Sequence, residues 1–425
     1  MRILLLTPYY APDLGPSAAL YTMLCEDLVK LGHQVSVICA VPHYPSGRVA
    51  VEFAGRWIER EQHAGVQVTR VRVPSVDRSR LGLRLLSFVC YQMLAAAAGC
   101  FQKCDVVIAS NPAFEIALPL FLLGFLRARP VVYSVHELYP DVGAAAGIFH
   151  HRPVIRLVDG LERYCAQRAA RVRVLSESYA RALEARGIAP DKLIVIGDWL
   201  DTEFLQPLPR QNAFARRTGL EGCFVVLYAG NLGPTQGLEF VLEAAERLTA
   251  QTDIRFVLVG EGTAKAGLED LAQSMGLANV TFLPFQPREL LPEVLATADV
   301  SLLSLRQGLG AGSVPSKLHS ILGSGRPVIA AVDADSETAR LVGEARCGRV
   351  TAPGDAAALF RAVLELHGNE EGRQHMGENG RQFVVRFHSR QRAAESFEDL
   401  LCAIQNPPRE PGAGRVAEGR TIFHG

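Results

Sequence analysis

Short apolar runs alternate with amphipathic stretches along most of the chain. The first run, residues 2–6, is followed by a Pro/Gly loop, a helical pattern over 17–31 and a second apolar run over 34–40. This order predicts a strand, a helix and a second parallel strand, because a continuous apolar run is typical of a strand covered on both faces. The first half therefore predicts an α/β domain with a doubly wound parallel sheet. Its further strands are predicted at 66–73, 105–109, 131–134, 171–175 and 193–196.

The pattern restarts at Phe224. An apolar strand leads into a glycine loop, NLGPTQG, and a helical pattern follows over 238–248. The chain is thus expected to hold two Rossmann-like doubly wound domains that face each other across a ligand cleft. Further strands of the second domain are predicted at 254–259, 280–283, 300–303 and 328–330.

A chain of 425 residues suits about two domains. We predict an N-terminal domain over 1–199 and a C-terminal domain over 200–385, with a Pro-containing linker at 200–209. A last helix, within 386–405, is expected to pack back toward the N-terminal domain. The segment 406–425 is rich in Pro and Gly, which predicts a disordered tail.

Positive and negative residues balance, with 44 Lys and Arg against 44 Asp and Glu. Without a net field to attract nucleic acid, an anionic ligand must be bound locally. The nine cysteines show no CxxC pair and no Cys/His cluster of metal-ligand spacing, which favours free thiols in a reducing cytoplasm. The N-terminal apolar run is too short for a signal peptide and is interpreted as the first strand. We therefore expect a cytoplasmic protein.

A run of 18 residues without a charge follows Arg84, and two more arginines, Arg78 and Arg80, precede it. A basic flank on an apolar stretch favours a helix that lies in the membrane interface. A buried helix and a membrane span over 85–102 are the alternatives that the sequence leaves open. We expect peripheral contact with the inner face of the plasma membrane through 78–101.

The stretch 306–330, RQGLGAGSVPSKLHSILGSGRPVIA, predicts a glycine-rich loop, a short helix, a turn and a buried strand. The amides of 308–313 are expected at the N-terminus of that helix, where unpaired N–H groups and the helix dipole favour an anion. Lys317, one turn into the helix, adds a positive charge. The stretch therefore predicts a phosphate or pyrophosphate site, and the alternative is a flexible turn without a ligand.

Polar residues directly after strands are the other candidates, because ligands of parallel sheets bind beyond the carboxyl ends of the strands. Asn111 follows one predicted strand, and His136 and Glu137 follow the next. A histidine beside a carboxylate can orient a sugar hydroxyl or shuttle a proton. The alternative is that His136 caps the following segment. The first loop holds only Gly15 of a GxGxxG fingerprint, which argues against NAD binding.

These loops give the chain a resemblance to a known family. In order and spacing they resemble the retaining glycosyltransferases of the two-domain B-type fold (family 4-like), over residues 1–400. They are most similar to the bacterial branch that builds capsule, O-antigen and exopolysaccharide, which includes colanic-acid and L-fucosamine transferases. The segments that carry the resemblance are TPYYAPDLGPSA, LVKLGHQVSVI, SVHELYPD, SESYARALEARGIAPDKLIVIGDWLD, YAGNLGPTQGLEFVLEAA, LVGEG and VPSKLHSILGSGRPVIA.

The resemblance implies transfer of a sugar from a nucleotide-diphosphate sugar to an acceptor hydroxyl, with the anomeric configuration retained and with neither a metal nor another cofactor. It implies an N-terminal domain that binds the acceptor and a C-terminal domain that binds the nucleotide-sugar. UDP-sugars are favoured over GDP-sugars. The expected acceptor is a lipid-linked or other glycan of cell-surface polysaccharide synthesis. Such transfer needs donors for the leaving diphosphate and groups that hold the sugar in line.

The resemblance also implies roles for particular residues. Gly15 would lie near the donor phosphates, and His136, Glu137 and Lys317 would form the catalytic group. Arg306 or Arg326 is expected to assist Lys317 at the diphosphate. The other positions implied to bind the donor are Asn231, Gln236, Gly237, Glu261, Phe285, Gly312, Ser313, Ser316 and Ser320.

The chain departs from the family pattern at two places. Many members have an Arg and a Lys where this chain has Asn231 and Gln236, and a pair of glutamates where it has Gly312 and Ser320. The exopolysaccharide branch often shows the same Asn and Gln with a Pro-Ser-Lys, which makes Lys317 the first choice for the diphosphate. The missing carboxylates favour an alternative, a catalytically impaired nucleotide-sugar-binding scaffold of a polysaccharide assembly complex. A sugar-nucleotide epimerase is a third hypothesis.

Overall fold

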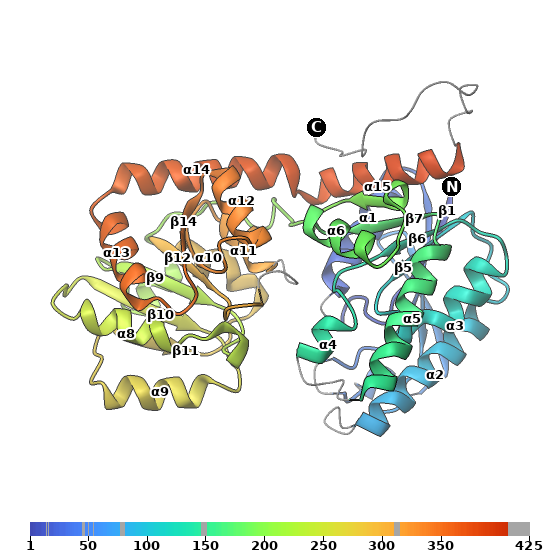
Figure 1. Cartoon of the computed structure of the whole chain (residues 1–425), viewed down its shortest axis with the longest axis horizontal. Coiled ribbons are helices and arrows are strands. Elements are labelled where there is room, and N and C mark those ends of the chain that lie inside the picture. Colours follow the sequence, from blue (N-terminus) through green and yellow to red (C-terminus); the bar gives the residue numbers. More distant parts are fainter. Residues whose placement is uncertain are drawn as a thin grey trace. The chain divides into compact units, whose positions relative to one another are not determined.

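The computed structural model describes residues 1–13, 15, 17–44, 47–49, 51–53, 55–76, 81–145, 151–309 and 315–406 of the chain. The chain divides into two compact units. The first joins Met1–Asp198 to the C-terminal part that begins at Arg390, and the second comprises Trp199–Ser389. Each unit has its own sheet flanked by helices, which confirms the predicted α/β class (Figure 1). Beyond Asn406, the predicted tail lies outside the described residues.

The first unit is built on an eight-stranded sheet in the order β3-β4-β2-β1-β5-β6-β7-β8. All neighbouring strands run parallel except β3 and β4. The apolar runs form the central strands because both of their faces are covered. The strands are β1 (Arg2–Leu6), β2 (Gln34–Ala40), β3 (Ile58–His63), β4 (Val66–Val71), β5 (Val106–Ser110), β6 (Val131–Ser134), β7 (Arg171–Val174) and β8 (Leu193–Val195).

The sequence did not predict β3, which adds an antiparallel edge strand to the predicted parallel sheet. β3 pairs antiparallel with β4, and four of its six side chains are exposed. A two-residue turn joins the strands, with φ of 48° at Ala64 and 83° at Gly65, the conformation that tight hairpins use. An edge strand that buries little has no apolar run or alternation, and hydrophobic periodicity therefore misses it.

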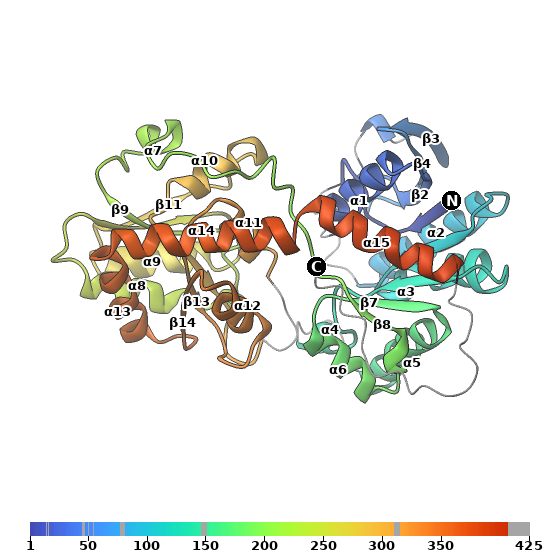
Figure 2. The ribbon, with the colours of Figure 1, turned by 90° about the horizontal axis from the view of Figure 1, so that it is seen from above.

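Five helices of the first unit form two groups. α2, α3 and α5 pack in a row, and α1 packs against α15 (Figures 1 and 2). Arg390, at the start of α15, donates to Asp27 at 2.6 Å and to Glu26 at 3.0 Å on α1. The helices are α1 (Ala18–Lys30), α2 (Leu81–Gly99), α3 (Ala113–Leu120), α4 (Asp141–Ala145), α5 (Arg152–Arg168), α6 (Glu177–Ala185) and α15 (Arg390–Gln405).

The uncharged run of the sequence forms α2. Its one side-chain amide, Gln92, joins α2 to α3: Nε2 donates to the Phe114 carbonyl at 3.1 Å, and Oε1 accepts from the Leu118 amide at 2.9 Å. The polar group inside the run is therefore satisfied by the neighbouring helix. Within the described part of the chain, no helix combines the length and the hydropathy needed to cross a membrane.

The second unit has a six-stranded parallel sheet in the order β11-β10-β9-β12-β13-β14. β14, at one edge, was not predicted either, because only one of its four residues is buried. The strands are β9 (Phe224–Ala229), β10 (Ile254–Val259), β11 (Val280–Leu283), β12 (Val300–Ser304), β13 (Val328–Ala331) and β14 (Gly348–Thr351).

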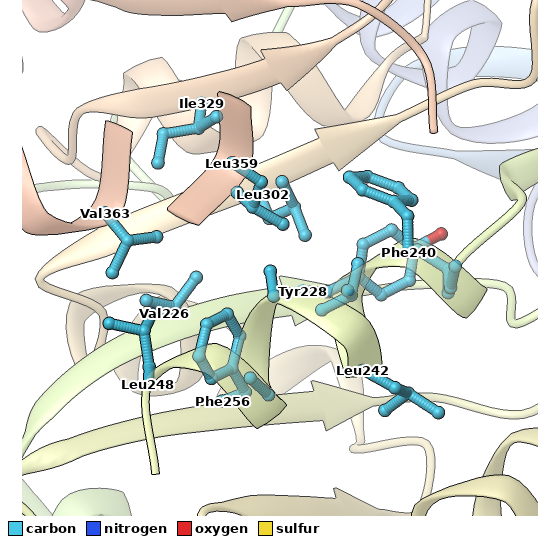
Figure 3. Close-up of a cluster of buried hydrophobic side chains, with 14 of the residues drawn as sticks. Val226, Tyr228, Phe240, Leu242, Leu248, Phe256, Leu302, Ile329, Leu359 and Val363 are labelled. Atoms are coloured by element: carbon cyan, nitrogen blue, oxygen red, sulfur yellow. The ribbon is translucent and has the colours of Figure 1, made fainter. Parts of the chain in front are cut away.

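Alternate residues of the strands pack on opposite faces of this sheet. Val226 and Tyr228 pack with residues of α8 and α13 (Figure 3) and also of α9, whereas Val225 and Leu227 pack with residues of α7 and α10. The stretch 200–209, expected as a linker, packs on this unit through the buried Leu205. The helices are α7 (Ala213–Arg217), α8 (Glu239–Arg247), α9 (Lys265–Ser274), α10 (Leu291–Ala296), α11 (Lys317–Gly323), α12 (Glu337–Ala345), α13 (Ala356–His367) and α14 (Glu370–Phe387).

Candidate active site

In the first unit, His136 lies directly beyond the end of β6, and its ring is held from two sides. Nε2 lies 2.8 Å from the Tyr21 hydroxyl of α1, and Nδ1 lies 3.6 Å from the Asp198 carboxylate, which follows β8. Both ring nitrogens thus face partners in the same unit. The imidazole is oriented by the protein before any ligand arrives.

A buried ion pair supports this histidine. Arg173 in β7 is fully buried, and it donates to Asp198 at 2.9 Å and to the Ile196 carbonyl at 2.6 Å. Burial opposes the charge of Asp198, but His136 and Arg173 outweigh it and hold the pKa of that carboxyl well below its usual range. Burial lowers the pKa of His136 despite Asp198, which favours the neutral imidazole near pH 7.

Asn111, beyond the end of β5, fixes the turn that carries the predicted His136 and Glu137 pair. Its Oδ1 accepts from the His136 amide at 2.8 Å, and its Nδ2 donates to the Glu137 carbonyl at 2.6 Å. The Glu137 side chain is exposed, whereas His136 is half-buried. The two predicted catalytic residues therefore differ: the ring of His136 is fixed, and the carboxylate of Glu137 is open to solvent.

Gly15 lies in the loop after β1, where packing requires a glycine. A Cβ at this position would lie 2.3 Å from the Tyr9 ring. The Gly15 amide donates to Asp13 at 2.7 Å, and the other oxygen of this buried carboxylate accepts from the His43 amide at 2.9 Å. Asp13 thus ties the loop after β1 to the loop after β2.

In the second unit, Lys317 is the first residue of α11, not one turn into it as predicted. Its Nζ donates to the Tyr228 hydroxyl at 2.6 Å and lies 4.4 Å from the centre of the Tyr228 ring. A Cβ at Gly230 would lie 2.3 Å from Lys317 Cε, so the glycine leaves the space through which this side chain passes. Burial lowers the pKa of Lys317 to about 8.

No carboxylate of the described residues forms an ion pair with Lys317. Tyr228, its partner, is neutral, and its hydroxyl donates a hydrogen bond to the Asn231 carbonyl at 2.7 Å. A desolvated ammonium beside a neutral hydroxyl gains most from a ligand that brings negative charge. The arrangement suits an anionic group such as a phosphate.

Two glycine loops meet at the carboxyl edge of the second sheet. A Cβ at Gly260 would lie 1.9 Å from the Gly230 carbonyl, and one at Gly262 would lie 2.3 Å from the Leu232 carbonyl. The Leu232 amide also donates to the Glu261 carbonyl at 2.9 Å. Only glycine permits backbones to approach this closely, and the loops after β9 and β10 are thereby joined.

Several polar groups at the loop after β9 are already bonded to one another. Gln236 Oε1 accepts from the Gly233 amide at 3.1 Å, and the Asn231 side chain is exposed. Gly237 has φ of 56°, and Arg306 passes beside it to pair with Glu239 at 3.0 Å. Of the predicted assistants to Lys317, Arg306 therefore lies at this loop with its charge already paired.

Other predicted residues are spread over the same edge. Glu261 pairs with Lys265 at 2.9 Å, and Phe285, beyond the end of β11, is 70% exposed. Ser316 precedes Lys317 and is exposed, and Ser320 is half-buried on α11. Gly312 and Ser313 lie outside the described residues.

Two expectations about the stretch 306–330 are corrected. The Gly308 amide, expected among the anion-binding groups, donates to the Asp333 carboxylate at 2.9 Å. Arg326 precedes β13, so it lies at the amino edge of the parallel sheet, opposite to the edge that carries Gly230 and Lys317. There it donates to the Leu208 carbonyl at 2.9 Å. The structure does not bring Arg326 to the predicted donor residues.

Sequence reasoning did not select Tyr21, Arg173, Asp198 or Tyr228. Tyr21, Asp198 and Tyr228 lie in or beside segments whose pattern indicates only a buried core. Arg173, inside the strand RVRV, carried the one usable signal, because an arginine in a covered strand requires a buried partner. Within the described ranges, no three His, Cys, Asp or Glu side chains come close enough together to hold a metal ion.

Comparisons with known proteins identify the class that this fold and these loops define. Residues 210–383 match the family "Glycosyl transferases group 1", and residues 17–199 match the "Glycosyl transferase 4-like domain". The chain belongs to this glycosyltransferase family. Its fold is the two-domain B-type glycosyltransferase fold, as the resemblance implied.

Relatives and solved structures agree. The chain is 30% identical to WcaI of Escherichia coli, whose name assigns it to colanic acid biosynthesis, over 80% of this chain and 86% of WcaI. It is 25% identical to WbjE of Pseudomonas aeruginosa, named as a glycosyltransferase, over 75% and 83% of the two chains. Sucrose-phosphate synthase from Thermosynechococcus elongatus has a similar structure, with a TM-score of 0.72, 18% identity and coverage of 95% and 99%. HepE of Anabaena, solved in complex with UDP, has a TM-score of 0.69 at 18% identity, over 95% and 100% of the two chains.

Replacing Asp198 tests the buried ion pair. We expect Asp198→Asn to lower the free energy of unfolding by about 3 kcal/mol or more, because Arg173 would keep a buried charge without a carboxylate. Urea unfolding followed by circular dichroism measures the loss. The depressed pKa makes the contribution of Asp198 fully present above its unfolded value near 3.8 and lost as pH falls below it. The difference from the wild type should therefore shrink in acid.

The pair of Arg186 with the exposed Asp141 provides the control in the same unit. Asp141→Asn should change the free energy of unfolding by less than about 1 kcal/mol. Equal losses in the two variants would contradict the special position of Asp198.

The pH dependence of stability tests the burial of Lys317. Its pKa is about 8 in the folded protein against an ordinary 10.5, so the folded state releases this proton first and stability rises with pH between these values. Lys317→Met removes the titration. The free energy of unfolding of the wild type minus that of the variant should increase from pH 7 to pH 10. The exposed Lys103→Met is the control, and a constant difference for Lys317→Met would contradict the prediction.

Proposed function

We propose that this protein is a retaining, metal-independent glycosyltransferase that moves a sugar from a nucleotide-diphosphate sugar to an acceptor in cell-surface polysaccharide synthesis. UDP-sugars are the favoured donors, and a lipid-linked or other glycan is the acceptor. The observation that carries the proposal is the Lys317 ammonium, half-buried beside a glycine loop with only the neutral Tyr228 hydroxyl as its described partner. The name of WcaI and the UDP complex of HepE support the pathway and the nucleotide.

The chemistry proposed for the second unit is charge stabilisation. As the bond between the sugar and the diphosphate breaks, negative charge grows on the leaving phosphate, and the Lys317 ammonium stabilises it. Tyr228 holds the ammonium in place, and the exposed Asn231 and Ser316 supply further hydrogen-bond donors. Glu261 and Phe285 are proposed to lie near the nucleoside. No other cofactor is assigned.

In the first unit, His136 and Glu137 are proposed to contact the donor sugar. The ring of His136 cannot rotate freely, because Tyr21 and Asp198 face its two nitrogens. The His136 ring is therefore suited to orient a sugar hydroxyl. The exposed Glu137 carboxylate can accept a hydrogen bond from that hydroxyl. Gly15 is proposed to leave room for the donor phosphates.

A second candidate function has its own observation. The side-chain oxygen of Gln236 accepts a hydrogen bond from its own loop, and Ser320 occupies the position where the family pattern has a glutamate. A protein that keeps the phosphate-binding lysine without these groups suits a scaffold that binds the nucleotide-sugar and does not turn it over. Transfer of radiolabelled sugar to a membrane fraction separates the two candidates.

Contact with the inner face of the plasma membrane is part of the proposal. Exposed apolar side chains form a stripe along α2, with Leu85, Val89 and Met93 four residues apart. α5, which packs on the other side of α3, exposes four arginines, and its two acidic residues are half-buried or buried. An apolar stripe together with a basic helix in the same unit matches the surface of an anionic membrane.

Thermal unfolding with a panel of nucleotides tests the donor. A ligand at about 100 times its Kd adds about 2.7 kcal/mol of stability, so UDP and UDP-sugars should raise the melting temperature more than GDP and GDP-sugars. Lys317→Met should lose most of the shift. The shift should also weaken as pH rises through about 8, where the amine loses its charge. No shift with any nucleotide in a folded sample would overturn the donor assignment.

Sedimentation with vesicles tests the membrane contact. The protein should bind phosphatidylglycerol vesicles in a salt-sensitive way and bind phosphatidylcholine vesicles less. Val89→Glu with Met93→Glu should weaken binding at least about tenfold, because two apolar side chains leave the lipid. The control is Val385→Glu on α14, which changes an exposed valine of the second unit. Unchanged binding of the double variant would exclude this surface.

A further inference from the structure

Trp57 is exposed directly before β3, where the hairpin of β3 and β4 begins. It is 67% exposed, whereas the other tryptophan of the chain, Trp199, is 4% exposed. Its carbonyl accepts from the Arg72 amide at 2.9 Å, which continues the pairing of β3 with β4. A large aromatic ring left in water on a hydrogen-bonded hairpin is available to a ligand, and an aromatic side chain has few rotatable bonds to order on binding.

The ring lies at the edge of the sheet where ligands bind. β3 runs antiparallel to β4, its one neighbour in the sheet, with Ile58 opposite Val71, so the start of β3 lies at the carboxyl edge of β4, β2 and β1. Gly15 and His136 also follow strands at this edge. Strands lie about 4.8 Å apart, so Trp57 stands roughly 15 Å from the end of β1 along it.

Arg72 places a positive charge beside the Trp57 ring. The guanidinium carbon of Arg72 lies 5.5 Å from the centre of the Trp57 ring. Among the described residues, no carboxylate forms an ion pair with Arg72. The ring and the guanidinium are therefore presented together, with the positive charge unneutralised.

Arg70 anchors the hairpin that carries Trp57 and Arg72. Arg70, two residues before Arg72, is buried and pairs with Glu61 at 2.6 Å on β3. It also donates to the Ala11 carbonyl in the loop after β1, at 2.5 Å. The hairpin that carries Trp57 is thereby tied to the loop that contains Gly15.

We propose that Trp57 and Arg72 bind the acceptor, as a platform for a pyranose ring that carries an anionic group. The apolar C–H face of a pyranose can pack on the indole, and the guanidinium can bind a carboxylate or a phosphate through two hydrogen bonds. The anionic group comes either from a uronic acid of a glycan or from the phosphate next to the sugar of a lipid-linked acceptor. That the bound sugar is the acceptor rests on the proposed function, whereas the sugar-binding platform itself rests on the contacts described above.

The surroundings favour a sugar over a lipid surface. Between residues 32 and 82, Trp57 is the one large apolar side chain of the described residues that is exposed. Its neighbour Arg56 and most of β3 are polar and exposed. Insertion into a membrane needs several apolar side chains together, whereas one aromatic ring suffices to stack on one sugar.

Nuclear magnetic resonance of the two indole N–H groups tests the platform in the full-length chain. Trp57→Phe identifies the Trp57 signal, and the Trp199 signal is the internal reference. Glucose 1-phosphate and glucuronic acid should shift the Trp57 signal at millimolar concentration, and glucose should do so at least about fivefold more weakly. A response to only one of the two anions names the source of the charge. Arg72→Gln should remove the preference for anionic sugars, whereas Arg60→Gln, an exposed arginine on β3, should not.

The outcomes separate this inference from the proposed function. If UDP-sugars cause no thermal shift but the Trp57 signal still responds to the anionic sugars, the donor assignment fails and the platform stands. If the Trp57 signal responds to none of the three sugars, the platform is overturned. A Trp57 signal that responds only to phosphatidylglycerol vesicles also overturns it and makes Trp57 a membrane contact.

Discussion

A parallel sheet places the carboxyl ends of its strands along one edge, and this constraint decides where each unit can hold chemistry. In the first unit, Asn111, His136 and Asp198 follow three different strands and meet at that edge. In the second unit, Gly230 and Gly260 follow β9 and β10, and their backbones touch there. The opposite edge carries residues with structural contacts, as Arg326 shows.

The two units treat buried positive charge in opposite ways. Arg173 is fully buried and has its carboxylate, Asp198, at 2.9 Å, so its charge is neutralised within the protein. Lys317 has the neutral Tyr228 hydroxyl, and burial lowers its pKa to about 8. The first arrangement stabilises a fixed site around His136. The second leaves a cation whose desolvation is offset when an anion binds, which suits the proposed role of Lys317 in stabilising the departing diphosphate while the sugar is transferred.

Two surfaces of the first unit differ in the partner that their chemistry fits. The α2 stripe combines several exposed apolar side chains with the arginines of α5, which suits the plane of an anionic membrane. Trp57 is a single ring among polar neighbours with Arg72 stacked on it, which suits one sugar. The proposed lipid-linked acceptor would use both kinds of contact, because its sugar would be held at a membrane.

The sequence by itself determined the fold class, the strands that are covered on both faces, and the loops that follow them, because burial leaves an apolar pattern. It also pointed to Lys317 and His136. The sequence pattern did not predict edge strands such as β3, because few of their residues are buried. Arg326 was misplaced because α11 reverses the chain, so residues nine apart in sequence lie at opposite edges of the sheet. Only the tertiary structure brought His136 to Asp198, 62 positions later, because such a contact depends on the order of strands in the sheet, which local pattern does not encode.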